Sequence, residues 1–516
     1  MRRLLLLFFW ATLLNQAVAQ DGLETKRWFT TSTDSFTVFS QLSSRQTEKR
    51  SMELERWRNA SLQLLNVLNP QIQAAIPTYL YIFSDDDDYI LFSDGGEPAY
   101  YFSSPRANFI IMQDSDNGLK LAKHHYAHFL VNNRIQGLPR WYEEGMSHYL
   151  SRIEVSGNEV ELHRFNEEEF QLILALKNEI ELEELFYDDS ALASPRLVQI
   201  ANLKSAFFMH YLLHAHEREG FNNRTRVLEN YLKLIDQGRT ERFAFDQSFD
   251  FNMRRLARDF ERYLEAGLLR PERDKVLFNL PAIADIDVQE MSLEDKTLWL
   301  AEISLHAARF PLAAYFFNAR IESGQAPGRA YSGYADAVRM HDMQDESLEK
   351  LDDVTLVQYY EQALDRSAED YQVYLDFGQY YDSRRNECEP EPSIDARLFY
   401  ETQMQVYFQQ ALALNPENAE VNLSAAQVFL FEQQNWDEGV PLQEKAFAQL
   451  ASDTFVQEQA VEYALRAGDF ERAQTIIARM ARPMHFYGDP GWVTDLRLKL
   501  RAAQRGEPFD ACTSAE

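Results

Sequence analysis

The first half of the chain mixes short apolar runs with helical patterns. Three runs rich in aromatic and β-branched residues are typical of β-strands, namely Ser35–Gln41, Pro77–Phe83 and Ala107–Gln113. Thr47–Leu68 and Asn202–Leu264 instead carry apolar residues every three or four positions, which predicts helices. Arg152–Arg164 is expected to form a hairpin around Ser156-Gly157-Asn158. Together these patterns predict an α+β N-terminal domain.

The second half is almost wholly helical and contains an internal repeat. Tyr359–Tyr381 matches Tyr407–Phe429 at an offset of 48 residues, and in each a helix ending in Gln-Ala-Leu leads through a turn into a second helix. The offset equals one 34-residue tetratricopeptide period plus about 14 residues. We expect the added residues in a polar, proline-bearing loop, Ser383–Asp395. Glu462–Pro483 fits a further unit. The chain from about Glu294 onward therefore resembles a tetratricopeptide array, an all-α solenoid of stacked helix pairs.

The first residues have the pattern of a signal peptide. Arg2 and Arg3 precede an apolar run, Leu4–Leu14, and Ala17-Val18-Ala19 is a small-x-small cleavage site. The apolar run is too short for a transmembrane helix. We therefore expect cleavage after Ala19 and a secreted or periplasmic protein of bacterial type.

The composition narrows the class of partner. The formal net charge is −30, and such a field repels nucleic acid and anionic membrane surfaces. We therefore expect no nucleic acid and no membrane as partner, and a protein or peptide bound by the helical repeats. The two cysteines, Cys388 and Cys512, are able to pair in an oxidising compartment. Their positions in the sequence leave that pairing open.

Two histidines four residues apart stand in the segment Lys123–Leu150. On a helix, His124 and His128 share one face, and two imidazoles there are able to share one Zn²⁺. Glu144 is a candidate third ligand, because antiparallel packing of two consecutive helices would return it to the histidine pair. The alternative is that both histidines are ordinary polar residues on a partly buried helix.

The residues that follow the histidine pair carry a resemblance to a known family. Pro139-Arg140-Trp141-Tyr142-Glu143-Glu144-Gly145 resembles the peptidase MA-like gluzincin family, in which H-E-x-x-H is followed by Pro-x-Trp-x-x-Glu-Gly. The resemblance implies a zincin-like fold for residues 20–275, zinc as cofactor, and His124, His128 and Glu144 as its ligands. A proline-bearing, non-periodic linker is expected at residues 276–293, before helical repeats at residues 294–516.

Two positions depart from the family pattern. The catalytic glutamate of the family falls at His125, and a general base contributes ~10²–10⁴-fold to the rate. A neutral imidazole accepts protons near pH 6.5, so His125 is the candidate catalytic residue in its place. A tyrosine common among homologues falls at Asn202, three residues before the matched Ser205. The resemblance thus implies a zinc metallopeptidase-like protein whose hydrolysis is weak.

Three functions stay open at this point. The chain is an atypical zinc peptidase with His125 as base, an inactive pseudopeptidase that recognises polypeptide, or a repeat scaffold that binds protein partners. His148, four residues after Glu144, is a second open question. It either joins the zinc ion as a fourth ligand, which would close the position left for water, or it lies at the surface.

Overall fold

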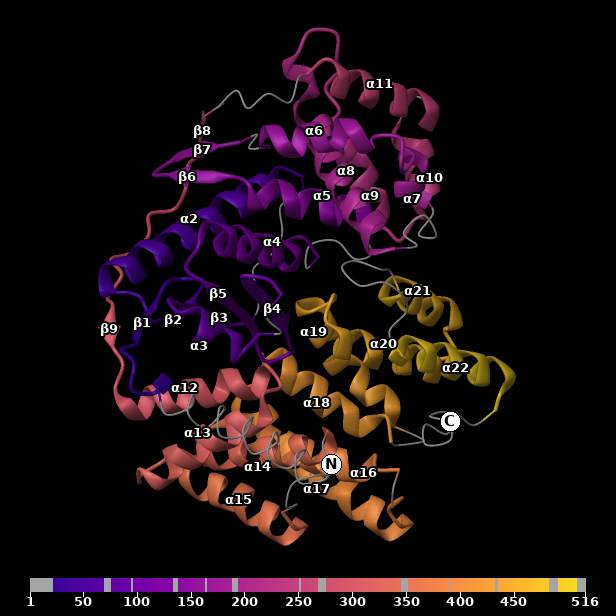
Figure 1. Ribbon diagram of the computed structural model, residues 1–516. Coiled ribbons are helices and arrows are strands. Elements are labelled where there is room, and N and C mark those ends of the chain that lie inside the picture. Colours follow the sequence, from indigo (N-terminus) through magenta and orange to yellow (C-terminus); the bar gives the residue numbers. More distant parts are fainter. Residues whose placement is uncertain are drawn as a thin grey trace, which may run out of the picture. The chain divides into compact units, whose positions relative to one another are not determined.

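The computed structural model (Figure 1) describes residues 22–68, 76–93, 96–132, 138–162, 165–187, 194–249, 252–267, 275–344, 351–388, 390–431, 435–481 and 491–507. The predicted signal peptide at residues 1–19 and Cys512 lie outside these ranges. Export and the pairing of Cys388 with Cys512 therefore stay predictions. Among the described residues, no helix combines the length and the apolar content needed to cross a membrane.

The chain divides into two compact units, each drawn from three separate stretches. Unit 1 comprises Met1–Ser51, Ile76–Leu119 and Asp285–Ala446, and unit 2 comprises Met52–Ala75, Lys120–Ala284 and Phe447–Glu516, in their described parts. The predicted domain ranges follow chain order, whereas these units follow contacts in space. Whether residues 20–275 fold as a domain by themselves stays a prediction.

Within the described residues, unit 1 is built on a six-stranded sheet with the order β4-β5-β3-β2-β1-β9. Its strands are β1 (Phe29–Ser32), β2 (Thr37–Ser40), β3 (Thr78–Phe83), β4 (Ala99–Ser103), β5 (Asn108–Gln113) and β9 (Gln289–Glu290). β2, β3 and β5 are parallel, and the other strands pair antiparallel with their neighbours. The parallel strands lie in the three predicted runs, which confirms them. β9 comes from the stretch predicted as a linker.

Alternation along β3 explains why the sheet carries a helix of the second half of the chain. Successive side chains of a strand point to opposite faces, so Tyr79 and Tyr81 share one face. Trp299 of α12 (Leu293–His306) lies on that face, with ring centroids 5.2 Å from Tyr79 and 4.6 Å from Phe39. The Tyr81 hydroxyl donates to the Trp299 carbonyl at 3.4 Å. The sheet and the first repeat helices therefore share one hydrophobic core.

The described helices of unit 1 pack in consecutive pairs (Figure 1). After the short α3 (Asp86–Ile90) and α12, they are α13 (Phe310–Glu322), α14 (Gly328–Gln344), α15 (Asp353–Arg366), α16 (Tyr371–Arg385), α17 (Ile394–Leu414), α18 (Ala419–Phe429), the 3₁₀ turn η3 (Trp436–Gly439) and most of α19 (Val440–Gln449). The first helix of each pair contacts the first helix of the next, α12 with α14, α14 with α16, and α16 with α18. This stacking confirms helical-repeat content in the second half of the chain.

The loop between the two matched repeats is shorter than predicted. The expected loop was Ser383–Asp395, but α16 continues to Arg385 and α17 begins at Ile394. The polar residues at the two ends of this stretch belong to helix termini, where polar side chains cap backbone groups. Ser393 is the N-cap of α17, and its hydroxyl accepts from the Ala396 amide. Much of the added length instead extends α17, which has 21 residues.

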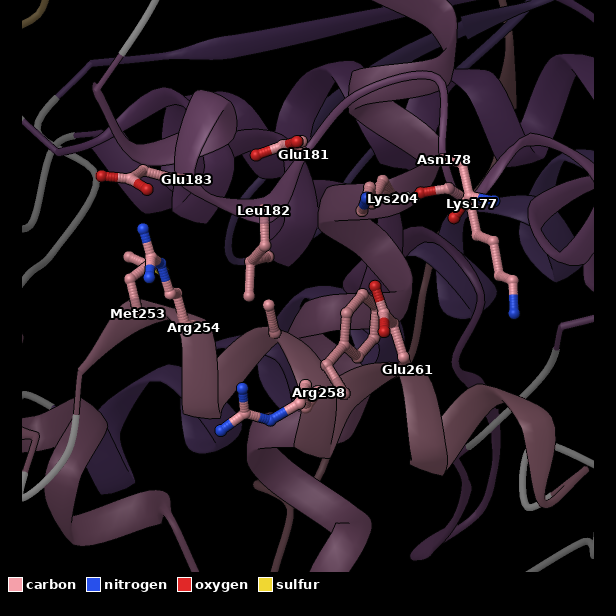
Figure 2. Close-up of a pocket in the computed structure, with 12 residues that line it drawn as sticks. Lys177, Asn178, Glu181, Leu182, Glu183, Lys204, Met253, Arg254, Arg258 and Glu261 are labelled. Atoms are coloured by element: carbon pink, nitrogen blue, oxygen red, sulfur yellow. Dashed lines mark hydrogen bonds between the residues drawn. The ribbon is translucent and has the colours of Figure 1, made fainter.

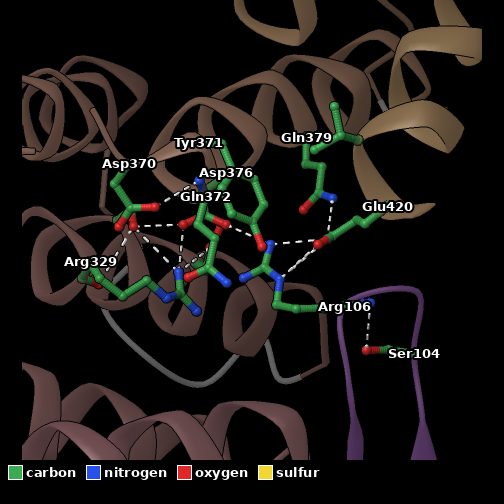
Figure 3. A network of polar contacts seen from close by, with 12 residues as sticks. Ser104, Arg106, Arg329, Asp370, Tyr371, Gln372, Asp376, Gln379 and Glu420 are labelled. Atoms are coloured by element: carbon green, nitrogen blue, oxygen red, sulfur yellow. Dashed lines mark hydrogen bonds and ion pairs between the residues drawn. The ribbon is translucent and has the colours of Figure 1, made fainter. Parts of the chain in front are cut away.

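A buried ion network joins the sheet of unit 1 to its helix pairs (Figure 3). Arg106, in the turn between β4 and β5, donates to Glu420 of α18 through Nε at 3.0 Å and to Asp376 of α16 through Nη2 at 2.9 Å. Asp376 also accepts from Arg329 of α14 at 2.5 Å, and Arg329 donates to Glu302 of α12 at 2.6 Å. The network thus spans the first helices of four successive pairs.

Asp376 is the centre of this network, with a side chain that is 1% exposed. Burial opposes its ionisation, but the guanidinium groups of Arg329 and Arg106 outweigh burial and lower the pKa of Asp376. The ionised carboxylate therefore depends on both arginines. Because Arg106 contacts Asp376 of α16 and Glu420 of α18, these two carboxylates are already engaged within unit 1.

Unit 2 is mostly helical and carries a small sheet with the order β6-β7-β8. Its described elements are most of α2 (Ser44–Leu68) and α4 (Asp116–Asn132), then α5 (Arg140–Ser151), β6 (Glu154–Ser156), β7 (Glu159–Glu161), α6 (Glu167–Leu176), α7 (Leu182–Tyr187), α8 (Pro195–His214), η2 (Ala215–Glu217), α9 (Thr225–Asp236), α10 (Glu241–Ser248), α11 (Met253–Glu265), β8 (Lys275–Leu277), α20 (Thr454–Arg466), α21 (Phe470–Met480) and α22 (Gly491–Arg505). The predicted hairpin is β6-β7, and Gly157 in its turn has a φ of 62°. The mixed α+β first half is confirmed, while its zincin-like character stays a hypothesis.

We predict that Arg106→Met destabilises the protein by ~3–5 kcal/mol, because it leaves two buried carboxylates without their shared guanidinium. Urea unfolding of the full chain measures this loss. The matched control is Arg27→Met, since Arg27 pairs with Glu290 at the exposed edge of the same sheet and its loss should leave the free energy of unfolding nearly unchanged. Equal midpoints for the two variants would contradict the prediction.

Candidate metal centre

The two helices that carry the candidate ligands are held together by buried aromatic residues of unit 2. Trp57 of α2 donates from its indole nitrogen to the Leu150 carbonyl at the end of α5, at 2.9 Å. Its ring also lies 6.2 Å from that of Tyr126 on α4. Trp57 and Tyr126 are each 1% exposed. The apolar positions of the predicted helix patterns thus bring α4 and α5 together.

The Pro-x-Trp part of the motif fixes where α5 begins and how it is anchored. Pro139 is the N-cap residue of α5, with a φ of −63° and ψ of 143°. Trp141 is 0% exposed and stacks on Phe186 of α7 at 4.7 Å, with its edge against Phe208 of α8 at 5.3 Å. These contacts place the next turn of α5, which carries Glu144, in the interior of unit 2.

Gly145 permits a close approach of α5 to α8. A Cβ atom at this position would lie 2.6 Å from the Ser205 carbonyl oxygen and 3.0 Å from its carbon. No side chain fits at these distances, so any larger residue would push the two helices apart. The glycine of the motif therefore has a packing role, and its neighbour Glu144 is turned toward α4.

The three candidate ligands converge between α4 and α5. The Nε2 atoms of His124 and His128 are 3.3 Å apart, and the Glu144 Oε2 atom lies 4.0 Å from the first and 3.9 Å from the second. Zinc ligands at ~2.0–2.2 Å in a tetrahedron are roughly 3.3–3.6 Å apart. The observed separations equal or slightly exceed these edges, so the donor set fits a zinc ion.

Glu143 orients one of these histidines, a role that the sequence did not predict. Its Oε1 atom lies 3.0 Å from His128 Nδ1, and the Asn132 amide also donates to it. A carboxylate accepts, so Nδ1 of His128 carries the proton and Nε2 keeps its lone pair. Carboxylates in this position fix the orientation and the basicity of metal-binding histidines. In the sequence, the only indication of this role is that Glu143 is a carboxylate adjacent to the candidate ligand Glu144.

Glu144 is the most deeply buried member of the cluster. Its exposed fraction is 0%, and burial raises its pKa from 4.5 to about 8. A cation within ~4–6 Å offsets such a shift, because it favours the ionised form of the carboxylate. The environment of Glu144 is therefore one that a bound cation would stabilise.

His148 also faces the cluster. Its Nε2 atom lies 3.8 Å from Glu144 Oε2, and its ring centroid lies 4.3 Å from that of His124. One ligand atom from each of His124, Glu144 and His148 lies within 4.8 Å of the other two. His148 is about a quarter exposed, which places it on the solvent side of the cluster.

The two departures from the family pattern have different surroundings. His125 is partly exposed, and its ring centroid lies 5.6 Å from that of His124. Asn202 on α8 accepts a hydrogen bond from Arg140 at the start of α5. Asn202 therefore helps to join α5 to α8. A role of His125 as a base stays a proposal.

A separate cavity of about 460 Å³ lies between the end of α6, α7, α8 and α11 (Figure 2). None of the residues of the histidine cluster lines it. Lys204, in its wall, is 5% exposed, and burial lowers its pKa to about 8. Its ammonium donates to the carbonyls of Lys177, at 2.8 Å, and of Ile180. These contacts cap the chain after α6 and give Lys204 a structural role.

The chain matches no protein-family model and no curated protein. A similar solved structure is a thermophilic tetratricopeptide-repeat protein of Thermus thermophilus, with 16% sequence identity, coverage of 41% of this chain and 99% of that chain, and a TM-score of 0.31. A likeness this low carries no argument about partners or activity. None of these comparisons supports the resemblance to the peptidase MA-like family, which stays a hypothesis, while the helical-repeat content rests on the stacked helix pairs.

Proposed function

We propose that this protein is an exported zinc-binding pseudopeptidase with weak or absent hydrolysis. The observation that supports it is the convergence of His124, His128 and Glu144 on one point, beside a helix position where the expected carboxylate base is His125. The chain would hold a metal ion while it lacks the group that moves protons in the family it resembles.

The chemistry of the donors favours zinc over other common metals. Two imidazoles and one carboxylate are a zinc donor set, whereas calcium and magnesium take mainly oxygen ligands. A bound zinc ion would supply Lewis acidity at this point. Loss of the carboxylate base costs ~10²–10⁴-fold in rate. The protein would therefore keep its metal ligands but hydrolyse peptides poorly.

We predict that the purified full chain binds one zinc ion and that His128→Ala releases it. His128 supplies a nitrogen donor that Glu143 orients, so its loss removes one of three ligands. Elemental analysis after dialysis measures the ratio of zinc to protein. His216→Ala is the matched control, since His216 is exposed and lies outside the cluster. Zinc-free wild-type protein after exposure to excess zinc would contradict the proposal, and so would rapid cleavage of unfolded polypeptides.

A second candidate function is protein binding by the helical repeats, and one surface of α17 favours it. Ile394 and Leu398 lie four residues apart on this helix and are 85% and 62% exposed. Residues four apart share a helix face. Contiguous exposed apolar side chains mark interaction sites more often than isolated ones do. This surface is separate from the face that Arg106 occupies.

We predict that the double variant Ile394→Lys, Leu398→Lys weakens binding of peptides selected against the wild-type chain from a random display library. The expected loss is roughly tenfold or more, as for anchor residues of an interface. Fluorescence anisotropy of the labelled peptides measures it. Val354→Lys, at another exposed apolar residue of unit 1, serves as control. Selected peptides that bind the double variant as tightly as the wild type would contradict this function.

A further inference from the structure

The cavity of about 460 Å³ in unit 2 has an apolar floor. Met253, Ala257 and Phe260 lie three or four residues apart on α11 and therefore share one face of that helix. Leu182 of α7 also lines the cavity (Figure 2) and is 3% exposed, while Phe260 is 1% exposed. A volume in this range with buried apolar walls is typical of sites that bind small organic molecules.

Charged side chains of both signs surround this floor. Arg254 and Arg258, four residues apart on α11, supply positive charge, and Glu181, Glu183 and Glu261 supply negative charge. All five residues are exposed, so the cavity opens to solvent. Within the described part of the chain, none of the five side chains forms an ion pair. Both signs of charge are therefore available to a ligand.

Lys204 adds a buried charge to the same wall. It is 5% exposed, and its ammonium donates to the carbonyls of Lys177, at 2.8 Å, and of Ile180. An ammonium has three N–H groups, so one donor is left on the cavity wall. Among the described residues, no carboxylate forms an ion pair with this ammonium. A buried charge without a counterion is costly, and the carboxylate of a ligand would offset that cost.

The mixture of charges selects the kind of ligand. A simple anion would be attracted by Lys204 and the arginines but repelled by the glutamates, and a simple cation would meet the reverse. A zwitterion satisfies both signs of charge at once. An apolar group on the same molecule would cover the floor formed by Leu182 and the α11 stripe, which removes further apolar surface from water.

We propose that this cavity binds an α-amino acid with a large apolar side chain. The carboxylate of the ligand contacts Lys204 and the arginines of α11, its ammonium contacts the glutamates, and its side chain packs on Leu182 and Phe260. None of the residues of the histidine cluster lines the cavity. The inference therefore goes beyond the proposed function and does not depend on the zinc site.

Isothermal titration calorimetry of the full chain with L-phenylalanine tests this inference, and we expect saturable binding of one molecule per chain. L-Phenylalaninamide lacks the carboxylate, and N-acetyl-L-phenylalanine lacks the ammonium. Each should bind roughly ten- to hundredfold more weakly, the weight of one hydrogen bond to a charged group. L-Alanine keeps both charges but lacks the large apolar group, and its affinity should be lower by roughly tenfold or more.

Variants of the exposed arginines test the carboxylate contact without a change in the buried core. The double variant Arg254→Gln, Arg258→Gln should weaken binding of L-phenylalanine by roughly tenfold or more. It should leave the affinity for L-phenylalaninamide nearly unchanged, because that ligand has no carboxylate to lose a contact. The matched control is Arg226→Gln, Arg239→Gln, which removes two exposed arginines of unit 2 outside the cavity and should match the wild type.

Two further variants complete the assignment of charges. Glu181→Gln, Glu261→Gln should weaken binding of L-phenylalanine and leave the affinity for N-acetyl-L-phenylalanine nearly unchanged. Lys204→Met keeps the aliphatic part of the side chain and should remove most of the preference for L-phenylalanine over its amide. Because Lys204→Met also loses the contacts with two carbonyls, circular dichroism melting curves verify that it is folded. The variants of exposed residues decide the question if it is not.

An amino acid is also able to chelate a metal ion, so His128→Ala serves as a further control. It removes a candidate zinc ligand and should bind L-phenylalanine as tightly as the wild type. Loss of binding in His128→Ala would place the amino acid at the metal and overturn the inference. Absence of saturable binding, or equal affinity for L-phenylalanine and its two derivatives, would overturn it as well. Zinc binding by the wild type is measured separately and is unaffected by these results.

Discussion

The burial of Glu144 between α4 and α5 is the constraint on which the candidate site depends. A carboxylate with no exposed surface strongly resists ionisation, and here burial raises its pKa to about 8. The imidazoles of His124 and His128 lie within 4.0 Å of it. A bound cation would offset the cost of this burial, because it would favour the ionised carboxylate and accept the imidazole lone pairs. The close approach at Gly145 and the anchor at Trp141 keep Glu144 in this position.

The repeat helices in the second half of the chain stabilise the six-stranded sheet of unit 1, in addition to any role in binding a partner. Trp299 on the first repeat helix covers the aromatic face of β2 and β3, and Arg106 reaches from the β4–β5 turn to α16 and α18, the first helices of two successive pairs. Unit 1 is therefore built from residues that are far apart in the sequence. A partner that binds the repeats would meet α17 rather than the face that Arg106 fills.

Local patterns predicted the central strands and the histidine pair, because both depend on short periodicities. The choice of Glu144 as a candidate ligand depended on the Pro-x-Trp-x-x-Glu-Gly motif. The structure places its Oε2 atom 4.0 Å from His124 Nε2 and 3.9 Å from His128 Nε2. The role of Glu143 depends on side-chain directions across α4 and α5, which the spacing of residues in the sequence does not reveal. The contact of Trp299 with the sheet is likewise non-local, and β9 is too short to have a pattern of its own.

The most direct measurement is a crystal structure of the zinc-loaded full chain, with anomalous diffraction recorded on both sides of the zinc absorption edge. The proposed site predicts one anomalous peak bound by His124, His128 and Glu144. An anomalous peak elsewhere, or no peak, would contradict it.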